Sequence, residues 1–420
     1  MALTADRNAT RWYFVALVAV AIAISYFDRQ TVSLAIAAIR RTIPISEQQF
    51  SYLQTAFLLS YACLYAIGGR MLDRLGTRRG FVLIMTAWSL ACMLHGVATG
   101  FAWLVAMRFL LGMGEGGGFP AATRVIAEWL PPQERSTGMG LINGGTAIGS
   151  VLAPPLIGII LLLSGWRMVF FASGGLGLLW VLWWTIMYRG NPATLSLETV
   201  DARVLARQLT FREVTSLRIV RTLVFAKFMS DSAWYFLLFW LPKYLYDVRG
   251  FDVKQVGSYA WIPFAASGVG SALGGWTSSR LLQRGFSLDR ARKLVLGICA
   301  AMMPAVMLVS LVPVHYAILL FSIAFFSQQS WSALIMTIPA DIFPLSVVGT
   351  VAGLVGFAGS IGGALFGLVA GWLLGHGYSY GMLFVVVGTF HLIGFFIIIL
   401  FGGQIQPLRP ADLKEIESHA

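Results

Sequence analysis

Long apolar stretches alternate with short polar segments along the whole chain. A helix needs about 20 apolar residues to cross the hydrocarbon core of a bilayer. Twelve stretches reach about that length, so the pattern predicts an all-α integral membrane protein with twelve transmembrane helices. The predicted helices lie near residues 12–36, 50–71, 80–99, 101–129, 137–163, 167–188, 219–246, 256–282, 292–312, 314–340, 347–374 and 379–402.

The longest polar segment, residues 189–218, falls between the sixth and seventh stretches. It divides the chain into an N-terminal bundle of six helices (1–188), a cytoplasmic linker, and a C-terminal bundle with a short cytoplasmic tail (219–420). Parallel six-helix repeats are one plan of secondary transporters. We therefore expect two pseudo-symmetric bundles.

A weak internal repeat supports this division. Gly68-Gly69 leads to Asp73-Arg74 after the second stretch, and Gly274-Gly275 leads to Arg280 after the eighth. The second copy has Ser279 at the position of Asp73, so the two copies differ at an acidic residue.

Charge is scarce, and its placement fits a membrane protein. Of the 420 residues, 58% are hydrophobic and 11% charged, whereas a soluble domain carries charge on about 25% of its residues. The net charge of +12 could indicate a nucleic-acid partner, but the basic residues gather in short loops between apolar stretches. Lys and Arg in such loops orient a membrane protein with its basic loops in the cytoplasm. We expect both termini in the cytoplasm and no nucleic-acid partner.

No residue pattern indicates an enzyme. No Ser-His-Asp set, metal-ligand cluster or phosphate-binding loop occurs in a suitable context. The three cysteines, Cys63, Cys92 and Cys299, lie in apolar runs and indicate neither a disulfide framework nor a metal site. The five histidines lie mostly at the ends of predicted helices or in loops, and we interpret them as interfacial.

Several motifs resemble those of a known transporter family. The segment Gly69-x-x-x-Asp73-Arg74-x-Gly76-x-Arg78-Arg79 resembles the signature loop of the major facilitator superfamily. Further motifs resemble the anion:cation symporter family, and within it the bacterial hexuronate and galactonate transporters. These are Tyr26-Phe27-Asp28-Arg29, Arg108 with Glu115, Pro131-x-x-Glu134-Arg135-Ser136, and Asn143-x-Gly145-x-x-x-Gly149 followed by Ala153-Pro154-Pro155.

The resemblance implies several roles. Gly69, Asp73, Arg74, Gly76 and Arg78 would form a conformational latch on the cytoplasmic side. A tyrosine matching Tyr61 faces the substrate in the family. The location implied is the bacterial inner membrane, and the protein is expected to work as a monomer without a cofactor, driven by a proton gradient. The chain departs from the family patterns in having Gln328-Gln329 where hexuronate transporters have His-Gln, and Gly356 where galactonate transporters have Asn.

Two arginines fall within predicted helices at similar depth. Arg29 lies 17 residues after Trp12, roughly 25 Å from the inner face, and Arg108 lies seven residues after Phe101, roughly 10 Å from the outer face. In a core about 30 Å thick both reach the outer half. Two guanidinium groups at one level suit a carboxylate, although each could instead neutralise a nearby acid.

Two acidic residues accompany the arginines and are candidates for proton coupling. Glu115 lies nearly two helical turns from Arg108, so both face the same side. Burial favours the neutral form of a carboxyl, whereas a nearby Arg favours the charged form, so such a group can switch with its partner. Asp28 points about 100° away from Arg29 and could be a second proton site or a salt-bridge partner of another helix.

The second half carries its own polar residues in apolar surroundings. Gln328, Gln329 and Trp331 occur near the middle of one predicted helix, where amides and an aromatic ring suit a polyhydroxylated ligand. Lys227 and Asp231 lie four residues apart on another helix and could neutralise each other.

These features together predict a proton-coupled symporter that imports an organic anion with a carboxylate by alternating access, with a hexuronate or related sugar acid as the expected substrate. Arg29, Tyr61, Arg108, Gln328, Gln329 and Trp331 would bind the substrate, and Glu115 and Asp28 would carry protons. The alternatives are an anion exchanger, an importer of small dicarboxylates or aromatic acids, and a membrane sensor that transports nothing.

Overall fold

The computed structural model describes residues 2–45, 47–188, 211–251, 259 and 261–408. Within these ranges all regular structure is helical. The helices are α1 (Ala2–Arg40), α2 (Glu47–His95), α3 (Phe101–Glu115), α4 (Gly118–Trp129), α5 (Pro132–Ser164), α6 (Trp166–Met187), α8 (Phe211–Ser216), α9 (Arg218–Asp247), α11 (Trp261–Gln283), α12 (Leu288–Met302), the 3₁₀ helix η1 (Met303–Leu311), α13 (Val314–Ile342), α14 (Leu345–Gly375) and α15 (Tyr380–Phe401).

The apolar stretches of the sequence fall on these helices as far as the structure describes them. Seven helices in the described part are long and apolar enough to cross a membrane, and a bent helix pair within α2 makes an eighth. The helices α3, α9 and α11 (Trp261–Gln283) are not among them; α3 has only 15 residues, and α9 carries Lys227 and Asp231 near its middle. The predicted all-α membrane fold is confirmed.

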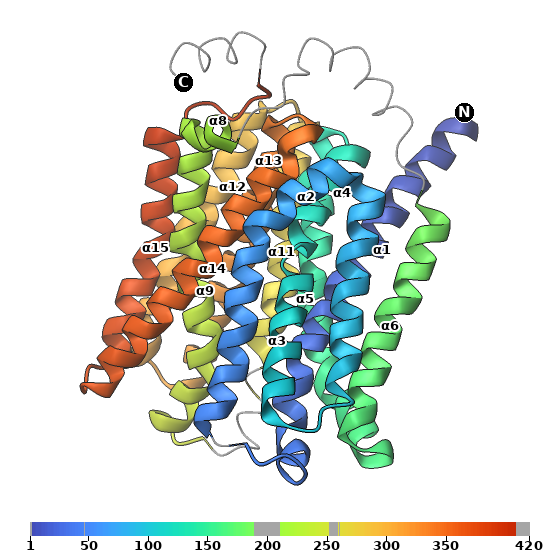
Figure 1. Ribbon diagram of the computed structural model, residues 1–420. Helices are drawn as coiled ribbons and strands as arrows, with labels where there is room; N and C mark the ends of the chain where they lie inside the picture. Colours follow the sequence, from blue (N-terminus) through green and yellow to red (C-terminus); the bar gives the residue numbers. More distant parts are fainter. Residues whose placement is uncertain (1, 46, 189–210, 252–258, 260, 409–420) are drawn as a thin grey trace. The chain divides into compact units, whose positions relative to one another are not determined.

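The element α2 holds two of the predicted spans joined by a turn. Gly76 has non-helical backbone angles, φ 77° and ψ 163°, and the two arms of α2 run in opposite directions in Figure 1. A residue with a side chain rarely adopts a positive φ, so glycine suits this turn. A second local break separates α3 from α4, which together occupy the single predicted span 101–129.

The described residues form two compact units. Unit 1 comprises Met1–Trp129, Gly145–Gln208 and Leu345–Phe357; unit 2 comprises Leu130–Gly144, Leu209–Pro344 and Ala358–Ala420. The boundaries cut through α5 and α14. The first part of α5, up to Gly144, belongs to unit 2, and the first part of α14, up to Phe357, belongs to unit 1. The predicted linker 189–218 lies largely outside the described residues, and the division into two sequence halves stays a prediction.

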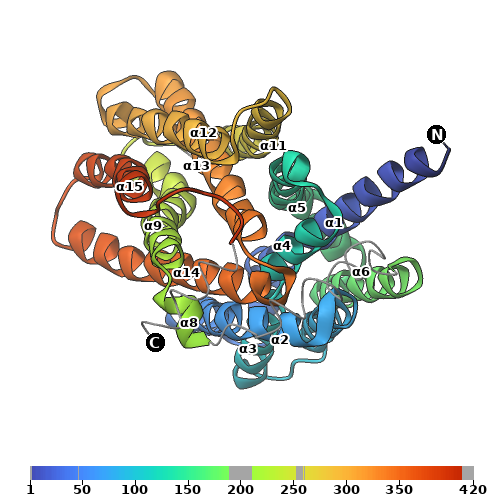
Figure 2. The ribbon, with the colours of Figure 1, turned by 90° about the horizontal axis from the view of Figure 1, so that it is seen from above.

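In unit 1, α2 packs against α3, α4 and α6, while α1 packs against α4 and α6. Figure 2, which looks along the helices, shows α3 beside α2. A side chain at Gly112 would clash with the Phe57 carbonyl, and one at Gly116 would clash with the Tyr61 carbonyl. Small residues let helix backbones approach closely in membrane proteins. These two glycines therefore set α3, with Arg108 and Glu115, directly against the first arm of α2.

In unit 2, α13 packs against α9, α11, α12 and η1, and every residue from Ser327 to Ile342 is buried. Helix α15 packs against α9, α12 and η1. The polar residues Gln328 and Gln329 therefore lie inside the unit and not on its surface.

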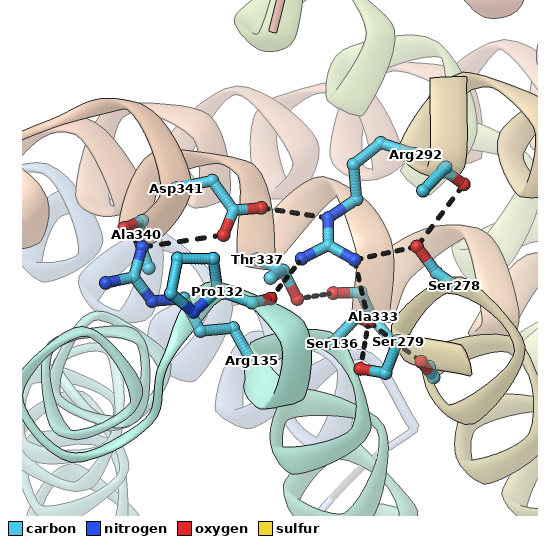
Figure 3. A network of polar contacts seen from close by, with 12 residues as sticks. Pro132, Arg135, Ser136, Ser278, Ser279, Arg292, Ala333, Thr337, Ala340 and Asp341 are labelled. Atoms are coloured by element: carbon cyan, nitrogen blue, oxygen red, sulfur yellow. Dashed lines mark hydrogen bonds and ion pairs between the residues drawn. The ribbon is translucent and has the colours of Figure 1, made fainter. Parts of the chain in front are cut away.

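A buried polar network ties the first turn of α5 to three other helices of unit 2 (Figure 3). Arg292 Nε lies 2.8 Å from Asp341 Oδ2, and both side chains have no exposed surface. The same guanidinium donates from Nη1 to the hydroxyls of Ser136 and Ser278, at 2.8 and 2.7 Å. Arg135 donates to the carbonyl of Ala340 and lies 3.5 Å from Asp341 Oδ1. The arginines thus meet their charge partner on α13 at the end of that helix.

Ser279, which stands at the repeat position of Asp73, belongs to this network. Its hydroxyl lies 2.9 Å from the Ser136 hydroxyl and accepts a hydrogen bond from the Thr137 N–H. A serine can make these contacts without adding another charge to a region that already holds Arg135, Arg292 and Asp341.

We predict that Asp341→Ala lowers the free energy of unfolding by about 3–5 kcal/mol, because it leaves two buried arginines without their carboxylate. The measurement is thermal or denaturant unfolding of the purified protein in detergent. The matched control is Asp289→Ala, which breaks the partly exposed pair Asp289–Lys293 (2.7 Å) and should cost about 1 kcal/mol or less. Equal losses in the two variants would contradict a structural role for the network.

Candidate functional site

Unit 1 gathers three charged side chains from two helices. Arg29 comes from α1, and Arg108 and Glu115 come from α3. Arg29 Nε lies 2.6 Å from Glu115 Oε2, and the Ser25 hydroxyl donates to the same oxygen at 2.7 Å. The Glu115 side chain has no exposed surface, while Arg29 retains 17%. Glu115 therefore pairs with an arginine on another helix and not with Arg108 on its own.

Arg108 is buried without a full set of acceptors. Its Nη2 donates to the Arg29 carbonyl (3.0 Å) and to Gln54 Oε1 (3.1 Å). Its Nε and Nη1 have no partner among the described residues, and the residue is 1% exposed. Glu115 Oε1 likewise lacks a partner there. Unpaired buried donors on a charged group cost free energy, so this guanidinium is suited to an incoming anion that supplies acceptors.

Aromatic rings enclose the two guanidinium groups. The Arg29 guanidinium carbon lies 4.4 Å from the centre of the Tyr26 ring and 4.5 Å from that of Tyr61. Phe57 lies 5.0 Å from the Arg108 guanidinium carbon and stacks on Tyr61. Ring faces attract cations and exclude water. The structure thus places Tyr61 beside the predicted carboxylate-binding arginines.

Asp28 lies apart from this ion pair. It is fully buried and accepts a hydrogen bond at Oδ1 from the hydroxyl of Ser173 on α6. Its Oδ2 has no partner among the described residues. The structure therefore gives Asp28 a hydroxyl as partner, and its proton-coupling role stays a prediction.

In unit 2, the two adjacent glutamines have different environments. Gln329 Oε1 accepts from the Asn143 amide on α5 at 2.7 Å. Gln328 donates from Nε2 to Asp231 Oδ1 at 3.4 Å, and its Oε1 has no partner among the described residues. Gln329 is thus fixed by a neighbouring helix, while Gln328 keeps a free acceptor.

Trp331 is fully buried and its ring meets His391 of α15 edge-on, with 5.2 Å between ring centres. The indole N–H and both ring nitrogens of His391 have no partner within the described part of the chain. The sequence predicts interfacial histidines; His95 does lie at the end of α2, whereas His391 lies near the middle of α15, and both are fully buried. The position of His391 near the middle of an apolar span could have revealed this.

The pair Lys227–Asp231 on α9 completes this polar region. Lys227 Nζ lies 3.0 Å from Asp231 Oδ1 and donates to the Ser332 hydroxyl at 2.8 Å. The two residues do pair with each other, as their spacing indicated. The partners Ser332 and Asn143 were not predicted, because they lie on other helices.

The predicted latch centres on Asp73 in the turn of α2. Its Oδ1 accepts from the Gly349 N–H (3.0 Å) and from Arg124 Nη1 (2.8 Å). Its Oδ2 accepts from the Thr350 N–H and hydroxyl, both at 2.7 Å. Arg124 also donates to the Leu345 carbonyl. The carboxylate therefore binds N–H groups near the start of α14, where the helix dipole favours an anion.

The other latch residues have different roles. Gly69 crosses α14 at Gly349, where a side chain at Gly69 would clash with the Gly349 carbonyl. Gly76 forms the turn, Arg78 donates to the Thr185 carbonyl at 2.6 Å, and Arg74 is exposed. Sequence reasoning missed Arg124, which joins Asp73 to Thr77.

Gly356 of α14 faces Tyr65. A side chain at this position would overlap the Tyr65 ring, which lies edge-on to Tyr61 with 5.1 Å between ring centres. Where galactonate transporters have an Asn, this chain therefore has a glycine. The Tyr65 ring fills the space that an Asn side chain would take.

Several known proteins are similar to this chain in sequence or in fold. Residues 18–367 match the family model described as Major Facilitator Superfamily. A hexuronate transporter of Escherichia coli (strain K12) is 30% identical over 404 residues, covering 92% of this chain and 93% of the relative. A probable sulfoacetate transporter of Cupriavidus necator is 30% identical and covers 91% of this chain and 92% of the relative.

Among solved structures, the proton:xylose symporter XylE bound to a bromodeoxyglucose superposes with a TM-score of 0.72, at 15% identity, over 98% of this chain and 99% of that one. This likeness shows the fold. The resemblance to hexuronate transporters is confirmed by the matched relatives, and so is the expectation of a transporter instead of an enzyme. With a family match that spans most of its length, the chain belongs to the Major Facilitator Superfamily.

Proposed function

We propose that the protein is a proton-coupled symporter that imports a hexuronate or a related sugar acid across the bacterial inner membrane by alternating access. The observation that carries the proposal is Arg108, a buried guanidinium with two unpaired nitrogens beside the Arg29–Glu115 ion pair. The hexuronate transporter relative supports the substrate class.

The proposed coupling follows from an exchange of partners at Arg29. In the structure, Arg29 is neutralised by Glu115 at 2.6 Å. A substrate carboxylate that binds Arg108 and Arg29 replaces Glu115 as the partner of Arg29. The displaced Glu115 would then be a buried charge without a cation, which is costly, so it takes up a proton. One anion thus enters together with a proton.

We assign the recognition of hydroxyl groups and the ring face to Gln328, Gln329 and Trp331 of unit 2. Gln328 offers a buried carbonyl oxygen without a protein partner in the described chain, and Trp331 offers an unpaired indole N–H. A site built to hydrogen-bond hydroxyls rejects ligands that lack them, because its buried polar groups are then left unpaired.

We predict that Arg108→Lys abolishes uptake and weakens sugar-acid binding at least about ten-fold, because an ammonium group cannot offer a carboxylate the planar donors that the unpaired Nε and Nη1 of Arg108 provide. Uptake into proteoliposomes and binding calorimetry measure the two effects. The control is Arg167→Lys, since Arg167 stacks on Trp166 and donates to the Ala98 carbonyl, away from the charged cluster. Near-normal uptake by the Arg108 variant would rule out the carboxylate clamp.

We predict that Asp73→Asn impairs transport more than binding. The amide keeps the shape of the side chain but gives one neutral oxygen in place of two charged ones, so part of the contacts to Gly349, Thr350 and Arg124 is lost. Initial uptake rates should fall by about ten-fold or more while the dissociation constant changes little. A large loss of affinity with an unchanged transport rate would contradict the latch assignment.

The experiment that tests the proposed function uses Glu115→Gln, which mimics the protonated carboxyl and cannot release a proton. The variant should lose accumulation driven by a pH gradient. It should still bind substrate and exchange it in counterflow, because exchange requires no net proton release. Binding should also depend less on pH, since one titrating group is gone.

Both assays are run on the same proteoliposome preparation, with Glu213→Gln of the short helix α8 as the control carboxylate. If the Glu115 variant still concentrates substrate in response to the gradient, Glu115 is not the proton carrier, and Asp28 is the next candidate. Wild-type uptake that ignores the gradient would favour an anion exchanger instead.

A further inference from the structure

The Lys227–Asp231 pair differs from the sealed ion pair of the same unit. The side chains of Arg292 and Asp341 have no exposed surface, whereas those of Lys227 and Asp231 retain 6% and 12%. Residual exposure lowers the desolvation cost of an ion pair and leaves its polar atoms within reach of solvent-sized molecules. The access indicates that the Lys227–Asp231 pair can meet a small polar molecule.

The pair lies directly against a glycine, which has no side chain to displace it. Gly359 of α14 lies against α9, where a side chain would clash with the Asp231 carboxylate and reach 3.0 Å from a Lys227 side-chain carbon. Any larger residue at position 359 would therefore displace the carboxylate.

Unpaired polar atoms gather around the same pair. Gln328 Oε1 has no partner among the described residues, while the Nε2 of the same amide donates to Asp231. Lys227 Nζ has three N–H bonds, of which Asp231 and Ser332 use two. Buried polar groups in folded proteins are nearly always hydrogen-bonded, so a free acceptor next to a free donor calls for a ligand or water.

We propose that Lys227, Asp231 and Gln328 form a subsite in unit 2 that takes an uncharged, hydroxylated group of a sugar acid, and that this subsite selects sugar acids with one carboxylate over those with a carboxylate at each end. The inference rests on the proposed function and narrows its substrate class. The relatives do not decide the question, because a hexuronate carries one acidic group and sulfoacetate carries two.

The charge balance of the cluster is the reason for the selection. Lys227 is already neutralised by Asp231, so the cluster has no net charge to offer a second carboxylate. A hydroxyl can accept from Lys227 and donate to Gln328 Oε1 at the same time. A carboxylate can only accept, so even with the remaining Lys227 N–H as donor it would leave the Gln328 oxygen unpaired and would face the Asp231 carboxylate, and like charges in close contact are strongly unfavourable.

The test compares D-galactonate with galactarate, which differ only in having CH₂OH or a carboxylate at one end of the same carbon chain. Both acids are fully ionised at pH 7.5. We expect the wild-type protein to bind D-galactonate at least about ten-fold more tightly than galactarate in calorimetry. Asp231→Asn frees the Lys227 charge for the second carboxylate, so the preference should shrink by about ten-fold.

The double variant Lys227→Gln/Asp231→Asn separates charge from shape. It removes the cation together with the anion, so it should again prefer D-galactonate. The matched control is Asp289→Asn, which breaks another pair spaced four residues apart on α12 and should leave the preference unchanged. A preference for D-galactonate that is kept in these variants also shows that losing a charged pair does not by itself misfold the protein.

Two results would overturn the inference while leaving the proposed function intact. One is equal wild-type affinity for the two acids, which needs no variant. The other is a wild-type preference that Asp231→Asn does not reduce although the variant is folded. If the wild-type protein binds no sugar acid at all, the proposed function fails and the inference fails with it.

Discussion

A charged side chain that leaves water for the interior of a membrane protein needs a partner, and this constraint organises the protein around its arginines. Arg29 meets it through Glu115 at 2.6 Å, with Ser25 bound to the same carboxylate oxygen. Arg108 meets it only in part, through a carbonyl and an amide oxygen that carry no net charge. The cost of this incomplete pairing is tolerable if an anion completes it during the transport cycle. The same balance explains why Glu115 lies next to two arginines and not in an apolar wall.

The buried ion pairs can be ordered by how easily a partner could be exchanged. Arg292–Asp341 is sealed from solvent and bound by several further hydrogen bonds, which suits a permanent structural contact. Arg124–Asp73 is almost as buried, but it joins a turn to the start of a helix, a contact that can form and break as a unit. Arg29–Glu115 keeps 17% exposure on the arginine. Of the three pairs, its cation is the most exposed, which agrees with the proposed exchange of the glutamate for a substrate carboxylate.

The sequence predicted the spans and the charged residues well, because lipid tolerates only long apolar helices and makes each intramembrane charge conspicuous. The sequence predicted poorly which side chains form ion pairs and hydrogen bonds with one another. Glu115 was matched by spacing to Arg108 on its own helix, yet its partner is Arg29 on another. Asn143 and Arg124 were seen only as motif or span residues, although they fix Gln329 and Asp73. Such pairings depend on the rotation of each helix about its axis, which a single sequence does not determine.

Helix rotation and approach are set here largely by where side chains are absent. Gly112 and Gly116 bring α3 to the backbone of α2, and Gly359 brings α14 to the carboxylate of Asp231. The Tyr65 ring occupies the space beside Gly356, where an Asn would present an amide. These glycines therefore fix how closely the helices approach one another within each unit, although they make no polar side-chain contact themselves.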